Sequence, residues 1–171
     1  MTPPLPKRIM AVDPGIQYLG VAILEGDQLR WYAVKTFPER KVLSNMRPQV
    51  KQYLTTIFER YRPDVLAVEE PFYVQSLASV NLCKLTENIK TWGKWKGLRV
   101  HSYYPAAVKA FFCRDQKTKE SLAEAAVVQY PSLARYLTLL PWQRRYWFHV
   151  FDAVGLGLMC HKKLTRCQIS P

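Results

Sequence analysis

The feature that most constrains this chain is an apolar segment, residues 8–24, interrupted at Asp13 by the turn sequence Asp-Pro-Gly. Residues 8–14 have the pattern of a short buried strand that ends at this turn, and residues 18–26 have the pattern of a second strand. After another short turn, residues 29–37 are rich in β-branched and aromatic side chains. Three strands joined by short turns predict an antiparallel meander.

The rest of the chain alternates between helical and strand patterns. Residues 44–61 place apolar side chains on one helical face, and residues 64–72 form an apolar run without alternation, as in a central strand covered on both faces. Such a strand can lie parallel to the first. The later expected elements are a helix over 76–95, a strand over 98–104, and helices over 105–112, 118–130 and 142–164. The sequence therefore predicts an α/β protein with a mixed five-stranded sheet, three antiparallel strands followed by parallel strands, flanked by helices.

Length and composition favour one domain with a hydrophobic core. The chain has 171 residues, 49% of them hydrophobic, so we expect a single domain over 1–171 with flexible tails at 1–7 and 165–171. No apolar run approaches the ~18–20 residues that span a membrane. The first residues lack the apolar segment of a signal peptide. We therefore expect a soluble intracellular protein with no membrane contact.

The charge of the chain favours a polyanionic partner. Lys and Arg number 25 against 13 Asp and Glu, a net charge of +12, with a pI near 9.7. Nucleic acid fits because each phosphate contact releases counterions. An acidic membrane surface is the rival partner, with residues 159–168 as a weak candidate anchor. The four cysteines form no CxxC pair and the three histidines are scattered, so a zinc site is poorly supported.

Several side chains with metal-binding chemistry end the predicted strands or lie on the last helix. Asp13 ends the first strand, Glu69 and Glu70 end the central strand, and His149 and Asp152 share one helix face. Clustered carboxylates repel one another unless a cation lies among them, and oxygen ligands favour Mg²⁺ or Mn²⁺. Two such ions are a known device for phosphodiester cleavage, so a basic chain with this cluster is a candidate nuclease. Taken singly, these residues also fit an ordinary turn, a solvated strand end and a core histidine.

Three segments, IMAVDPGIQYLGVAIL, LAVEEPFY and HVFDAVGLGL, carry a resemblance to a known family. Over roughly residues 8–162 the chain resembles the RuvC Holliday-junction resolvases of the RNase H-like nuclease superfamily. The resemblance implies an RNase H-like fold and two Mg²⁺ or Mn²⁺ ions per active site. Glu70 ranks lower because the family often has a non-acidic residue there. The metal ligands that the resemblance implies are Asp13, Glu69, His149 and Asp152.

The histidine departs from the commonest pattern, because many family members have an aspartate at the position of His149, while some have histidine. A neutral imidazole still binds Mn²⁺ or Mg²⁺ but removes one negative charge. We therefore expect the metal preference of the site to shift towards Mn²⁺.

The resemblance also assigns side chains to DNA contact. Phe72 matches an aromatic residue that stacks on bases near the junction point, with Tyr73 as second choice, and a core aromatic is the alternative interpretation. Lys109 and Lys119 match basic positions beside the scissile phosphate, where we expect both a catalytic and a DNA-binding role, and Lys117 is the alternative to Lys119. For each lysine, a solvated surface position is the alternative.

The function that the resemblance implies is structure-selective DNA cleavage. The chain would be a crossover junction endodeoxyribonuclease that resolves Holliday junctions by paired symmetric nicks in recombination and repair, as a homodimer on a four-way junction. In the helix over 76–95, Trp92 and Trp95 stand where the bacterial resolvases have a glycine-rich pattern. The alternatives are a broader branched-DNA, flap or RNA:DNA hybrid nuclease of the same fold, and a non-catalytic branched-DNA binding module. The expected setting is the bacterial cytoplasm, with the chain encoded by the bacterium or by a phage; one chain does not identify a partner branch-migration motor.

Overall fold

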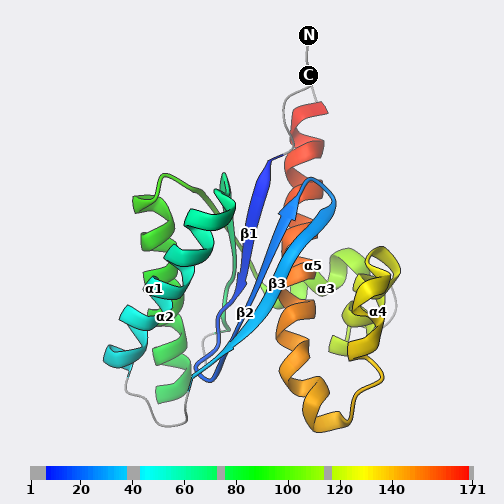
Figure 1. The fold of residues 1–171 in the computed structure, drawn as a ribbon, viewed down its shortest axis with the longest axis horizontal. Coiled ribbons are helices and arrows are strands. Elements are labelled where there is room, and N and C mark those ends of the chain that lie inside the picture. Colours follow the sequence, from blue (N-terminus) through cyan, green and yellow to red (C-terminus); the bar gives the residue numbers. More distant parts are fainter. Residues whose placement is uncertain (1–6, 38–42, 73–75, 114–116, 170–171) are drawn as a thin grey trace.

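In the computed structural model the chain forms one mixed sheet between two layers of helices (Figure 1). The structure describes residues 7–37, 43–72, 76–113 and 117–169. The strands are β1 (Arg8–Asp13), β2 (Tyr18–Glu25), β3 (Gln28–Thr36), β4 (Val65–Glu69) and β5 (Arg99–Tyr103). The helices are α1 (Leu43–Tyr61), α2 (Leu77–Trp95), α3 (Pro105–Phe112), α4 (Lys119–Gln129) and α5 (Pro141–Ile169), with a 3₁₀ helix, η1 (Pro131–Tyr136), before α5.

The sheet has the order β3-β2-β1-β4-β5, with β1 at its centre. β1, β2 and β3 pair antiparallel, whereas β4 pairs parallel with both β1 and β5. The predicted α/β fold, three antiparallel strands followed by parallel strands, is confirmed. The helices α1 and α2 cover one face of the sheet, and α3, α4 and α5 cover the other (Figure 1).

Side chains alternate along the central strands, and this alternation decides what faces each helical layer. On β1, Met10 and Val12 belong to the core shared with α1 and α2, whereas Ile9 and Ala11 pack against α5. β4 follows the same alternation in register with β1. Both faces of these strands are fully buried, as their continuous apolar runs predict.

Three details of the helices differ from the expectation or refine it. α5 continues to Ile169, so residues 165–169 are helical rather than part of a tail; the last turns of the helix contain Lys162, Lys163 and Arg166, which are good helix formers. The 3₁₀ helix η1 was not expected. α4 begins at Lys119 because the Thr118 side chain accepts a hydrogen bond from the Ser121 N–H at 3.1 Å. None of the helices in the described part of the chain, α5 included, combines the length and apolarity needed to cross a membrane.

Candidate active site

Asp13 and Glu69 lie side by side at the carboxyl ends of the two central strands. The last pair in the β1–β4 register is Val12 with Val68, so Asp13 and Glu69 are the next residues on each strand. Because side chains alternate, both point to the α5 face of the sheet, as Ala11 does. Asp13 is only 5% exposed, so its carboxyl group is largely removed from water.

Glu70 points to the opposite face and has a partner there. Its two carboxylate oxygens accept hydrogen bonds from the Lys90 ammonium group of α2 at 3.0 and 3.1 Å. Its backbone N–H donates to the Tyr103 carbonyl at 2.9 Å. Glu70 therefore pairs with a lysine that it shares with Glu87, and it lies apart from Asp13, Glu69 and Asp152.

The N-terminal half of α5 brings His149 and Asp152 to the strand carboxylates. The Nδ1 atom of His149 lies 2.6 Å from Oδ2 of Asp13, and Asp152 is 5% exposed. Gly20 of β2, which pairs with Asp13, makes this approach sterically feasible. A Cβ atom at Gly20 would lie 2.1 Å from the carbonyl oxygen of His149, so a glycine here sets the spacing between β2 and α5.

Two of the predicted lysines also reach this cluster. Lys119, the first residue of α4, places its Nζ atom 3.5 Å from Oδ2 of Asp152. Lys109 of α3 is close enough to lower the pKa of Asp152 and of Glu69. Lys117 precedes the helix, and both lysines are exposed, but it is Lys119 whose ammonium group reaches Asp152.

Burial and mutual repulsion raise the pKa values of the carboxyl groups. Burial, and then the charge of Asp152, hold the pKa of Asp13 well above its ordinary value. Burial, followed by the charges of Asp13 and Asp152, raises the pKa of Glu69 to about 9. Burial also raises the pKa of Asp152, against the opposing charge of Lys119. The pKa of His149 is lowered, first by burial and then by Lys119, so its imidazole is neutral at pH 7.

The donor set fits a divalent cation. Three carboxylates and an imidazole are suitable ligands for Mg²⁺ or Mn²⁺, and such an ion would relieve the repulsion among the buried acids. In the present side-chain conformations, no group of three or more His, Cys, Asp or Glu residues in the described part of the chain is arranged to hold a metal ion. The side chains instead form two pairs, Asp13 with His149 and Asp152 with Lys119.

Phe72 follows β4 and is not a core residue. Its side chain is 59% exposed, and its ring stacks on Tyr104, with centroids 5.8 Å apart and planes at 24°. Sequence reasoning did not select Tyr104, although its position at the end of a predicted strand was a usable signal. Tyr73 lies outside the described residues.

Tyr18 is a second residue at the site that sequence reasoning did not select. Its ring centroid lies 5.5 Å from that of His149 and 5.5 Å from that of Tyr146. The signal in the sequence was an aromatic residue at the start of the strand that pairs with the Asp13 strand. Tyr18 therefore connects the carboxylate cluster to a group of aromatic side chains on α5.

Comparisons with known proteins identify relatives by sequence. No protein-family model matches the chain. The crossover junction endodeoxyribonuclease RuvC of Akkermansia muciniphila is 32% identical over 107 residues, which cover 60% of this chain and 64% of that protein. RuvC of Koribacter versatilis is 26% identical over 128 residues, covering 71% and 77%. The chain spans less than two thirds of the length of the Akkermansia muciniphila and Mycobacterium ulcerans relatives, 64% and 59%.

Solved structures share the fold. The structure of T. thermophilus RuvC in complex with a Holliday junction substrate superposes with a TM-score of 0.73 at 18% identity, covering 93% of this chain and 96% of that one. The yeast mitochondrial Holliday junction resolvase Ydc2 superposes with a TM-score of 0.61 at 13% identity, covering 98% and 87%. The RNase H-like fold and the resemblance to the RuvC resolvases are both confirmed.

Proposed function

We propose that this chain is a divalent-metal-dependent endonuclease that resolves four-way DNA junctions by paired symmetric nicks. The observation that carries the proposal is the meeting of Asp13, Glu69 and Asp152, from three elements, with two lysines beside them. The net charge of +12 supports a polyanionic substrate. The names of the relatives, and the junction bound to T. thermophilus RuvC, support branched DNA as that substrate.

We assign the metal ligands to Asp13, Glu69, His149 and Asp152, for two ions of Mg²⁺ or Mn²⁺. Bound divalent cations would supply activation of a water nucleophile at neutral pH and stabilisation of the leaving 3′ oxygen, giving a 5′ phosphate and a 3′ hydroxyl. The three carboxyl groups supply the negative charge that attracts the ions. His149, kept neutral by burial, has a nitrogen lone pair available as a ligand.

Lys119 and Lys109 are the residues that would contact the phosphate. A phosphate group at the carboxylate cluster would lie next to the Lys119 ammonium group, which is 3.5 Å from Asp152. Ammonium groups beside a phosphate stabilise the negative charge that develops during cleavage. Both lysines come from helices that pack on the α5 face, so their positions depend on the same layer that carries His149 and Asp152.

Phe72 and Tyr104 are the residues that would contact bases at the crossover. Their stacked rings lie just beyond the ends of β4 and β5, and both are more than half exposed. Stacking on an exposed ring suits unpaired bases and tolerates any sequence. We propose that this two-ring platform holds the junction open beside the cleavage site.

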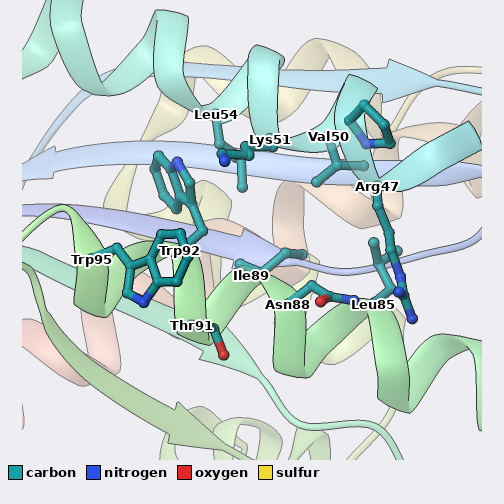
Figure 2. Close-up of a pocket in the computed structure, with 11 residues that line it drawn as sticks. Arg47, Val50, Lys51, Leu54, Leu85, Asn88, Ile89, Thr91, Trp92 and Trp95 are labelled. Carbon is teal, nitrogen blue, oxygen red and sulfur yellow. The ribbon is translucent and has the colours of Figure 1, made fainter. Parts of the chain in front are cut away.

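A homodimer follows from the substrate, because a four-way junction offers two symmetry-related strands to cut. We propose that the dimer forms through α2 and the groove between α1 and α2. The groove has a volume of about 550 Å³ and a largely apolar lining that includes Val50, Leu54 and Ile89 (Figure 2). At its rim Trp95 is 80% exposed, with the Lys51 ammonium group 5.8 Å from its ring centroid.

The dimer is tested by Trp95→Glu, because an exposed ring supports association and a carboxylate in its place opposes it. We expect the variant to sediment as a monomer and to make single nicks rather than paired nicks. Val128→Glu is the control, because Val128 is 84% exposed on α4, on the other face of the sheet. A monomeric wild type, or a Trp95→Glu variant that stays dimeric, would contradict the proposed interface.

The function is tested by cleavage of a labelled synthetic four-way junction in Mg²⁺ or Mn²⁺. Wild type is expected to make paired symmetric nicks. Asp13→Asn is expected to bind the junction but to cut it at least about 100-fold more slowly, because several kcal/mol of transition-state stabilisation by the cations is lost. Asp27→Asn makes the same charge change at an exposed turn at the opposite end of β2, and should cut like wild type.

The outcomes separate the candidate functions. Binding without cutting in either metal would replace the nuclease with a binding module. Faster cutting of a flap or of an RNA:DNA hybrid than of the junction would keep the nuclease and change its substrate. The relatives that were named on sequence similarity are bacterial, which supports a setting in a bacterial cell, with the chain encoded by the cell or by a phage.

A further inference from the structure

An aromatic cleft lies beside the carboxylate cluster and is not used by the proposed mechanism. It has a volume of about 500 Å³ and is formed by η1, the first turns of α5 and the start of β2, at the lower end of α5 in Figure 1. The residues that define this aromatic cleft are Tyr18, Arg135, Tyr136, Trp142, Tyr146 and Trp147.

The rings of the cleft hold one another in place. Tyr136 stacks on Trp147 with centroids 3.9 Å apart and planes at 25°, and Tyr146 meets Trp147 edge-on at 5.2 Å. The Tyr146 hydroxyl donates a hydrogen bond of 2.9 Å to the carbonyl of Val34 on β3. Trp142 differs from these rings because it is 70% exposed. The cleft thus has a fixed aromatic wall and one ring that a ligand can cover.

The cleft continues into the carboxylate cluster through a single side chain. Tyr18 contacts Tyr146 edge-on on one side and His149 on the other, each with ring centroids 5.5 Å apart. His149 in turn contacts Asp13. Only the Tyr18 ring therefore separates the cleft from a chain-like ligand that is held at the carboxylates.

The charge at the cleft is positive and has no acidic counterpart nearby in sequence. Residues 130–148 contain Arg135, Arg144 and Arg145 and no Asp or Glu. The Arg135 guanidinium lies 4.9 Å from the ring centroid of Tyr136 and donates hydrogen bonds to the hydroxyls of Tyr136 at 2.9 Å and Tyr32 at 3.2 Å. Among the described residues, Arg135 has no carboxylate partner within 4.0 Å. This cation remains available to an anionic ligand.

Aromatic faces next to unpaired cations suit a flat ring that carries a phosphate, which is the chemistry of a nucleotide. We propose that the aromatic cleft takes one unpaired base of the DNA strand whose phosphate lies at the carboxylate cluster, with Trp142 stacking on the base and Arg135 contacting the adjoining phosphate. This inference rests on the proposed function, because it requires a DNA strand at the cluster. It gives the site a second base contact, separate from Phe72 and on the other side of His149.

The test combines base deletion in the DNA with ring deletion in the protein. A series of four-way junctions, each with one abasic nucleotide at a successive position around the crossover, is bound in Ca²⁺ in place of Mg²⁺. With wild type, one abasic position besides the one that stacks on Phe72 is expected to weaken binding roughly 5- to 100-fold, the loss that one base–aromatic stack produces. In Trp142→Ala the intact junction should bind that much more weakly, and the same abasic position should have no further effect.

Leu140→Ala is the matched control, because Leu140 is 59% exposed just before α5 and does not line the cleft. It should keep the wild-type response to the abasic position. Arg135→Gln should weaken binding to all junctions and reduce the slope of log affinity against log salt by about 1, as the loss of one phosphate contact does.

The results distinguish failure of the cleft proposal from failure of the proposed function on which it rests. Equal wild-type binding to all abasic junctions, or abasic penalties that all persist in Trp142→Ala, would overturn the cleft while leaving junction cleavage intact. A change of oligomeric state in Trp142→Ala with unchanged DNA binding would assign the cleft to a second copy of the chain instead. Failure of wild type to bind or cut the intact junction would remove the proposed function, and the cleft proposal with it.

Discussion

Glu69 and Glu70 are adjacent in sequence but belong to two different kinds of site. Glu70, on the face covered by α1 and α2, accepts hydrogen bonds from Lys90, which also pairs with Glu87. Glu69, on the face covered by α5, lies with two other carboxyl groups whose combined charge its neighbours do not balance, and its pKa is raised to about 9. The two glutamates differ in burial and in the carboxyl groups beside them, so a cluster of buried carboxyl groups, rather than one carboxylate paired with a lysine, marks the candidate functional site.

The difference between the two glutamates is tested most directly by replacing each of them in turn with glutamine. Glu69→Gln should slow junction cleavage by about 100-fold or more, because a metal ligand is lost. Glu70→Gln should leave cleavage within about 3-fold and lower the free energy of unfolding by about 1 kcal/mol, because a partly buried ion pair is lost. Cleavage rates in Mg²⁺ and urea unfolding of both variants provide the measurement. Equal loss of cleavage in the two variants would contradict the distinction between the glutamates.

A second test moves α5 away from the strands, because the site needs the close approach of α5 to β2. Gly20→Ala places a methyl group against the backbone carbonyl of His149, which cannot rotate away, so α5 must shift. We expect a loss of stability of about 1–3 kcal/mol together with reduced cleavage. Gly155→Ala is the control within α5, because its Cβ would meet side-chain atoms of Leu122, the nearest being Cδ1 at 2.9 Å, rather than backbone. A Gly20→Ala protein with normal stability and cleavage would show that the spacing beside His149 is not restrictive.

The last prediction concerns pH and tests the charge argument without a substrate. In the metal-free protein, folded Glu69 keeps its proton from its ordinary pKa of 4.5 up to about 9, whereas the unfolded chain releases it at the lower value. The folded state binds more protons over this range, so the free energy of unfolding falls as pH rises. The melting temperature should fall by about 2–4 °C for each kcal/mol lost.

The same melting experiment contains its own controls. Glu69→Gln should flatten the dependence on pH, whereas Glu70→Gln should leave it unchanged. Added Mg²⁺ or Mn²⁺ should raise the melting temperature of wild type at high pH, because ligands that bind only the folded state stabilise it. A wild-type melting temperature that is constant between pH 5 and 9 would contradict the raised pKa values.

The sequence was sufficient to predict the sheet and its carboxylate edge. Short turns and continuous apolar runs predicted which strands pair antiparallel and which are covered on both faces, and parallel neighbours necessarily bring Asp13 and Glu69 together. The apolar pattern did not distinguish the two glutamates, since every residue before them in β4 is buried and apolar. The family resemblance selected Glu69, and the structure adds the physical difference between them, because Glu70 points to the opposite face and pairs with Lys90.

Other parts of the site depend on contacts that local patterns do not encode. Lys119 rather than Lys117 reaches the cluster because the helix begins after Thr118, a difference finer than sequence reasoning resolves at helix ends. The aromatic cleft depends on η1, a short 3₁₀ segment without periodicity, and on Tyr18, which comes from the other end of the chain. Both were missed because they arise from tertiary packing.

The alternation of side chains along β4 has a consequence for how this protein can evolve. Substitutions in the strand change one contact at a time, but a deletion or insertion of a single codon before Glu69 would reverse the face of every residue that follows it within the strand. Glu69 would then point to the face of Lys90, and Glu70 would take the place of Glu69 among the acids or be lost from the strand. We therefore expect β4 to accumulate substitutions far more readily than changes of length in any lineage that keeps the active site.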